Sequence, residues 1–238
     1  VKDADRISAF TSYMPQRFGL YEDLPVMENL LLHARLHGLP KAQQQATFDQ
    51  LLTFTRLGPF THRLAGQLSG GMKQKLGLAC ALIASPKILL LDEPGVGVDP
   101  VSRQDLWRMV NTLTGEGVAV VWATAYLDEA ERCEHVILLN EGKIGFQGPP
   151  ALLTDTLTDR SLMLVNPREN SRKILARALG LPTVSDGSIQ GNAVRVVLNK
   201  RGDRSEIKAL ADEVGAGLMT VKPRFEDGFI ELLGGGPS

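Results

Sequence analysis

The sequence predicts an α/β fold for residues 1–150, followed by a smaller α+β unit. Two continuous apolar runs, 88–91 and 118–122, are typical of parallel strands that are buried on both faces. A helical segment from about 101 to 114 separates them and starts behind Asp99-Pro100, a residue pair that favours a helix N-terminus. Because strand, helix and strand follow one another, we expect a right-handed crossover within a parallel sheet.

A helical subdomain is predicted beside this sheet, over about residues 22–85. Two helical stretches, 26–37 and 42–57, are separated by Gly38-Leu39-Pro40. Further along the chain, the segments 135–139 and 143–147 flank Asn140-Glu141-Gly142 and predict a β-hairpin.

The pattern changes after residue 150. We expect a strand at 161–165, a helix from Asn166-Pro167 to 179, a weak strand near 183–184, a strand at 193–198, a helix over about 203–214 and a strand at 218–221. This β-α-β-β-α-β order predicts an accessory α+β domain over residues 151–233. No chemical motif occurs in it, so no catalytic role is expected, and residues 234–238 read as a flexible linker.

Composition narrows the function classes. The 238 residues carry 26 Lys and Arg against 27 Asp and Glu, a formal net charge of -1, which gives no electrostatic reason to expect a nucleic-acid partner. No apolar run approaches the ~20 residues of a membrane span. The first residue is Val1 rather than Met, so we expect the chain to begin inside a longer polypeptide.

The densest motif is Leu68-Ser69-Gly70-Gly71-Met72-Lys73-Gln74. A Ser hydroxyl followed by two bare glycine amides at a helix start can bind a phosphate, and the helix dipole adds positive potential there. On its own, the motif is equally compatible with an ordinary helix start.

A second motif, Asp92-Glu93-Pro94, follows the apolar run 88–91. Ligands of α/β sheets bind at the carboxyl ends of parallel strands, which is where these carboxylates are predicted to lie. This position suits Asp92 for a metal ion and Glu93 for an attacking water.

Taken in order, these motifs resemble the nucleotide-binding domain of an ATP-binding cassette (ABC) transporter. The signature motif of the family resembles Leu68 to Gln74, and its Walker B motif resembles residues 88–93. The residues around Asp99 resemble the D-loop, and Tyr13-Met14-Pro15-Gln16 resembles the Q-loop. The resemblance covers residues 7–150. The segment 223–232 resembles the C-terminal extension of bacterial drug-exporter ATPases, and the nearest type is the first cassette of a tandem two-cassette efflux ATPase.

The resemblance implies a P-loop NTPase-like cassette that binds ATP and Mg²⁺. It implies Glu93 as the catalytic residue, Asp92 and Gln16 as Mg²⁺ ligands, and nucleotide contacts from Gln16, Ser69, Gly70, Gly71, Asp99 and the position of Ala125. A second cassette, in the same chain or a dimer, and transmembrane permease subunits are the implied partners. The implied role is ATP-driven efflux of drugs or other small molecules, from the cytoplasmic face of the cell membrane.

Two departures from the family pattern stand out. No G-x-x-x-x-G-K-[S/T] phosphate loop (Walker A) occurs in the 238 residues, so we expect a cassette truncated at its N-terminus that is inactive as an isolated chain. Ala125 stands where the family has its switch histidine, either naturally or by engineering, and alanine has no side-chain donor for a γ-phosphate. A purely regulatory cassette therefore stays open as an alternative. A soluble cassette acting on ribosomes or in DNA repair is disfavoured by the charge balance and by the ending at 225–232.

Overall fold

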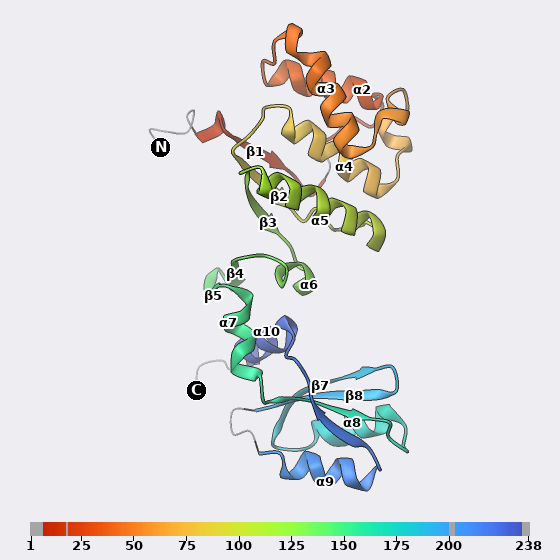
Figure 1. The fold of residues 1–238 in the computed structure, drawn as a ribbon, viewed down its shortest axis with the longest axis vertical. Coiled ribbons are helices and arrows are strands. Elements are labelled where there is room, and N and C mark those ends of the chain that lie inside the picture. The colour runs from red at the N-terminus through yellow and green to blue at the C-terminus, as the bar shows by residue number, and fades with distance from the viewer. Residues whose placement is uncertain (1–6, 18, 200–202, 235–238) are drawn as a thin grey trace. The chain divides into compact units, whose positions relative to one another are not determined.

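The computed structural model describes residues 7–17, 19–199 and 203–234. They form two compact units that meet between Ala125 and Tyr126 (Figure 1). The predicted cassette, residues 1–150, therefore extends across the boundary between these units.

A three-stranded parallel sheet organises the first unit, in the order β1-β2-β3. Its strands are β1 (Thr11–Met14), β2 (Ile88–Asp92) and β3 (Ala119–Ala123). The predicted parallel crossover is confirmed, because α5 (Pro100–Gly115) connects β2 to β3.

Burial alternates along these strands, which differs from the expected burial on both faces. Leu89 and Leu91 of β2 are buried under helices, whereas Tyr13 and Val121, on the opposite face, are 57% and 58% exposed. Since the apolar runs supply side chains to both faces, the sequence is suited to a second covering layer. The part of the chain that the structure describes in this unit covers only one face.

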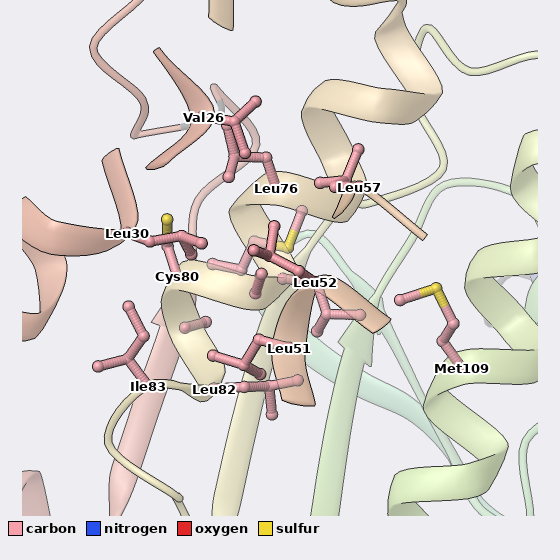
Figure 2. Packing of buried hydrophobic residues seen from close by; sticks show 14 of the residues in the cluster. Val26, Leu30, Leu51, Leu52, Leu57, Leu76, Cys80, Leu82, Ile83 and Met109 are labelled. Atoms are coloured by element: carbon pink, nitrogen blue, oxygen red, sulfur yellow. The ribbon is translucent and has the colours of Figure 1, made fainter. Parts of the chain in front are cut away.

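The remaining helices of the first unit are α2 (Val26–Leu36), α3 (Lys41–Thr55) and α4 (Gly70–Leu82). These three helices, which make up the predicted helical subdomain, share one core with β2 and α5. In Figure 2, Leu76 and Cys80 of α4 lie between Leu30 of α2 and Leu52 of α3. The central helix α4 is therefore fixed from several sides.

One aromatic contact joins α5 to the sheet. The rings of Trp107 in α5 and Trp122 in β3 stack with centroids 4.1 Å apart and planes inclined by 16°. Aromatic stacking adds to the stabilisation from area burial.

The second unit begins with α6 (Leu127–Ala130), the antiparallel hairpin β4 (Val136–Asn140) and β5 (Lys143–Gly148), and α7 (Pro150–Thr154). Its C-terminal helix α10 (Phe225–Gly234) packs on α6 and α7, with Phe225 in one cluster with Ala130, Val136 and Leu153. Gly234, which we expected to open the linker, ends this helix. Residues 235–238 lie outside the described residues.

The rest of the second unit is the accessory sheet, in which β6, α8, β7, β8, α9 and β9 follow the predicted β-α-β-β-α-β order. The strands are antiparallel in the order β7-β8-β6-β9, and α8 and α9 cover one face. Their bounds are β6 (Ser161–Val165), α8 (Ser171–Leu179), β7 (Val184–Gln190), β8 (Ala193–Leu198), α9 (Ser205–Glu213) and β9 (Gly217–Thr220).

The predicted start of α8 at Asn166-Pro167 is wrong. Asn166 has a φ of 51°, and the amide of Arg168 donates to the carbonyl of Val214, so this segment forms a turn. The helix starts after Asn170, whose side chain accepts a hydrogen bond from the amide of Arg172. The N-cap of α8 is therefore Asn170, whereas Asn166 was expected to start the helix.

Candidate nucleotide site at the sheet edge

The predicted carboxylates lie at the carboxyl edge of the parallel sheet. Asp92 ends β2, and Glu93 follows it directly. Gln16 follows β1, the neighbouring strand, and its Nε2 donates to Oε2 of Glu93 over 3.1 Å. The fold therefore brings Gln16 next to the adjacent carboxylates Asp92 and Glu93, although Gln16 and Glu93 are 77 positions apart in the sequence.

Glu93 has an unusual backbone conformation. Its φ is 47°, in the left-handed region that residues with a side chain rarely occupy. The amide of Glu93 donates to the carbonyl of Ala123 over 2.9 Å, which ties the turn to the end of β3. Such conformations persist where the surroundings fix them, and they are concentrated at functional sites.

Tyr13 is a further member of this edge that sequence reasoning missed. Its hydroxyl donates to Oδ2 of Asp92 over 2.8 Å. The hydrogen bond to Asp92 raises the pKa of Tyr13 above its ordinary value. The parallel register pairs Tyr13 with Leu90, and a prediction of that register would have indicated the contact.

The predicted signature motif forms the N-terminus of α4. Ser69 is the N-cap, and its Oγ accepts a hydrogen bond from the amide of Met72 over 3.3 Å. A Cβ on Gly70 would lie 2.8 Å from the carbonyl oxygen of Gly97, so the helix start approaches the loop after β2 closely. Gly71 is buried against Ser102 and leaves no room for a Cβ.

Asp99 caps α5 beside this helix start. Its Oδ1 accepts from the amides of Val101 and Ser102 over 3.1 and 2.9 Å. The Ser102 hydroxyl and amide hold the pKa of Asp99 below its ordinary value. The predicted cap is confirmed, whereas a contact between Asp99 and nucleotide stays a prediction.

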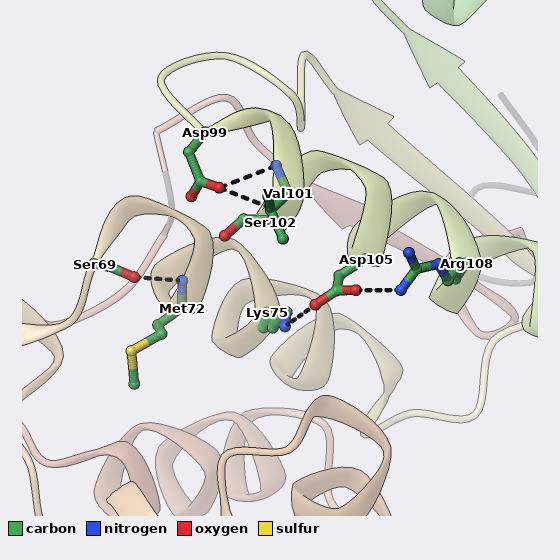
Figure 3. A network of polar contacts seen from close by, with 8 residues as sticks. All are labelled: Ser69, Met72, Lys75, Asp99, Val101, Ser102, Asp105 and Arg108. Atoms are coloured by element: carbon green, nitrogen blue, oxygen red, sulfur yellow. Dashed lines mark hydrogen bonds and ion pairs between the residues drawn. The ribbon is translucent and has the colours of Figure 1, made fainter.

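An ion pair missed by sequence reasoning joins the two helices (Figure 3). Nζ of Lys75 in α4 lies 3.1 Å from Oδ2 of Asp105 in α5, and Arg108 lies 2.7 Å from the other oxygen. The hydrogen bond from Lys75 holds the pKa of Asp105 below its ordinary value. Lys75 follows Gly71 by one helical turn, which is the signal that places both on the side of α4 facing α5.

A groove of about 710 Å³ opens beside the start of α4. The loop after β1 contributes Gln16, Arg17 and Glu22, α4 contributes Gly70 and Lys73, and the loop after β2 contributes Val96 and Gly97. Nζ of Lys73 pairs with Oε1 of Glu22 over 2.6 Å. The charge of Lys73 is therefore balanced within the groove, which leaves Arg17 and the helix N-terminus as its features that favour an anion.

Ala125 lies at the same sheet edge. It follows β3 by two residues, and Ala123 at the strand end accepts the amide hydrogen of Glu93. Its exposed methyl group offers no hydrogen bond.

The donor set at the edge fits Mg²⁺. Asp92 supplies a carboxylate and Gln16 an amide oxygen, and Mg²⁺ prefers such hard oxygen ligands. Among the described residues, no group of three or more His, Cys, Asp or Glu could hold a metal by itself. Nucleotide-bound Mg²⁺ is usually held by one or two protein groups together with phosphates and water.

Comparisons with known proteins identify the family of this chain. The family model described as ABC transporter matches residues 2–96. The chain is 30% identical over 226 residues to the Nod factor export ATP-binding protein I of Rhizobium etli, covering 93% of this chain and 69% of that protein. The chain belongs to the ABC transporter ATP-binding family.

One relative is similar over nearly the whole chain. The chain is 55% identical over 235 residues, 99% of its length, to the probable multidrug ABC transporter ATP-binding protein YbhF of Escherichia coli K12. It spans only 41% of that protein.

A solved ATP-binding subunit of an ABC transporter shares 29% identity and a TM-score of 0.56, covering 65% of each chain. The expected ABC ATPase cassette fold is thereby confirmed. Within the described residues, no helix has both the length and the apolar character needed to cross a membrane.

Proposed function

We propose that this chain is one cassette of a tandem two-cassette ABC ATPase that drives export of drugs or other small molecules through separate membrane subunits. The observation that carries the proposal is the convergence of Gln16, Asp92 and Glu93 at one sheet edge, with the Nε2 of Gln16 3.1 Å from Glu93. The span of 41% of the E. coli relative supports a protein with a second cassette. The names of the relatives, multidrug and Nod factor export proteins, support small-molecule export.

Asp92 and Glu93 have different roles in this proposal. Asp92, with Gln16, would hold Mg²⁺, which when bound neutralises charge on the phosphates. Glu93, which accepts a hydrogen bond from Gln16, would orient and polarise the attacking water. Because phosphoryl transfer needs positioning and charge stabilisation more than covalent chemistry, groups of this kind suit the proposed role.

The start of α4 serves the opposite nucleotide in this proposal. Ser69, Gly70 and Gly71 would bind the γ-phosphate of an ATP held by the phosphate loop of the second cassette. The exposed Ser69 and the positive end of the α4 dipole support this role. Asp99 adjoins this interface through its place at the start of α5, and the chain's own nucleotide would need a phosphate loop from outside residues 1–238.

Coupling to membrane subunits is assigned to the surface between the loop after β1 and α2. Tyr21, in the loop after β1, and Leu36, at the end of α2, are large apolar side chains that are 56% and 69% exposed. An exposed apolar surface of this kind suits a helix of a membrane partner. The proposed location is the cytoplasmic face of the cell membrane, with the cassette bound peripherally.

A regulatory cassette is the second candidate, and Ala125 favours it. Without a histidine at that position, the site built on this cassette has one donor fewer for the γ-phosphate. This site would then bind ATP and hydrolyse it slowly, while the opposite site supplies most turnover.

ATP hydrolysis by the purified full-length protein tests the proposal. Ser69→Arg puts a long side chain at the start of α4 and should remove most turnover, a loss of about a hundredfold or more. Ser188→Arg, the same change at an exposed position of β7, is the matched control and should keep full activity. Absence of ATPase activity in the wild-type protein, or equal activity in both variants, would contradict the proposal.

A further inference from the structure

Gln74 is a buried amide that the described residues leave without a hydrogen bond. It lies in α4 and is 1% exposed, and neither its Oε1 nor its Nε2 has a partner there. Asn29 in α2 is as deeply buried but makes four hydrogen bonds, to Tyr21, Leu24 and Pro25. The fold therefore satisfies a buried amide in the same unit, and Gln74 is an exception that needs an explanation.

The position of Gln74 on α4 shows which part of the chain it faces. At about 100° per residue, Gln74 lies about 40° from Gly70 and about 60° from Gly71 around the helix axis. Gly70 approaches the carbonyl oxygen of Gly97, and Gly71 packs against Val98 and Ser102. Since side chains on a helix lean towards its N-terminus, the amide of Gln74 belongs to the face of α4 that meets segment 93–102.

Segment 93–99 joins β2 to α5. Both Glu93 and Gly97 have positive φ, 47° and 71°. Its internal backbone hydrogen bond is the one from the amide of Val96 to the carbonyl of Glu93, over 3.1 Å. The segment carries Glu93 at one end and Asp99 at the other, so a rearrangement within it occurs between these two groups.

We infer that Gln74 is a positioning residue that favours a second arrangement of segment 93–99, the one adopted when ATP closes the two cassettes. An unpaired buried amide raises the free energy of the arrangement seen here. In an arrangement where the backbone of segment 93–99 forms a hydrogen bond with Gln74, this free-energy cost is absent. That arrangement is therefore favoured relative to the one observed here. Nucleotide binding then needs to supply less free energy to close the site.

This inference rests on the proposed function. It predicts that removing the amide of Gln74 makes the protein more stable but makes turnover require more ATP. Gln74→Met keeps the length of the side chain and removes both polar atoms. The observed arrangement should become more stable, so the Tm of the full-length protein should rise by about 2 to 6 °C. The ATP concentration for half-maximal turnover should rise about tenfold, equivalent to ~1.4 kcal/mol, whereas kcat at saturating ATP should change less than about twofold.

Gln50→Met is the matched control, because Gln50 is an exposed residue of α3, and it should change neither quantity. A lower or unchanged Tm in Gln74→Met would overturn the inference, since it would mean that the amide already has a partner, such as water. A higher Tm with an unchanged ATP dependence would overturn the link to closure. Failure of Gln74→Met to fold would also count against it, because an unsatisfied amide is dispensable for folding.

The two proposals fail in different ways. A wild-type protein without ATPase activity would contradict the proposed function. In that case the Tm comparison, together with the affinity for ATP measured by equilibrium titration of Gln74→Met and wild type, still decides the role of Gln74.

Discussion

Glu93 shows what a single residue adds to its motif. Its identity and its place after a strand are predictable from the apolar run 88–91 followed by Asp-Glu. Its left-handed backbone conformation, with φ of 47°, is not predictable from the sequence, because nothing in the local sequence requires it. The conformation depends on the bond from its amide to Ala123, a residue 30 positions away that only the folded sheet brings near.

Gly71 is required by the contact between two helix starts. Gly71→Ala would drive a methyl group into the Cβ and Oγ of Ser102, the latter residue being fixed in the first turn of α5. We expect the free energy of unfolding to fall by about 1 to 3 kcal/mol, as for other overpacked sites. Urea denaturation of the full-length protein measures this change.

Gly115→Ala is the corresponding control, since a Cβ there meets nothing within 4 Å. It should leave the free energy of unfolding within about 0.5 kcal/mol or raise it slightly, because alanine favours a helix. Similar losses in both variants would show that the contact with Ser102 is not the cause.

Among the elements, α10 joins parts of the second unit that are distant in sequence. Nη2 of Arg195 in β8 lies 2.5 Å from Oδ2 of Asp227 in α10, with both side chains almost fully buried. Arg160 binds Glu231 of the same helix over 2.9 Å. The helix is thereby tied to the accessory sheet at one face, while Phe225 packs among Ala130, Val136 and Leu153.

Removing one partner of the buried Arg195–Asp227 pair should lower the free energy of unfolding more than removing both partners. Arg195→Met leaves the carboxylate of Asp227 buried without its cation, and we expect a loss of about 3 to 5 kcal/mol. The double variant Arg195→Met, Asp227→Leu removes both charges and should recover at least half of that loss. Urea unfolding of the three proteins gives the coupling, and additive losses would refute it.

Element order was easier to predict than the links between elements. The β-α-β-β-α-β order after residue 160 follows from strand and helix patterns and is confirmed. The start of α8 failed because two Asn residues, Asn166 and Asn170, give similar local signals, and tertiary contacts choose between them. The ion pairs Lys75–Asp105 and Arg195–Asp227 join residues that are 30 and 32 positions apart. No local sequence pattern predicts such contacts.

For the whole molecule, the proposed tandem predicts two unequal ATP sites. Glu93 and Ala125 serve the site built on this cassette, which lacks a donor that commonly contributes about a hundred- to thousandfold in rate. Ser69 serves the opposite site. Glu93→Gln should therefore lower the ATPase rate of the full-length protein only modestly, whereas Ser69→Arg should remove most of it. Steady-state rates of the two variants decide this, and equal losses would show that the sites are alike.

The stacked pair Trp107 and Trp122 gives this chain a built-in optical label. These are the only two tryptophans of the 238 residues, and their rings lie 4.1 Å apart. Indole emission of the chain, excited where tyrosine does not absorb, therefore arises from one place, where the helix that follows Asp99 meets the strand that precedes Ala125. A spectral change then reports on that junction alone, and residues 126–238 contribute no tryptophan signal.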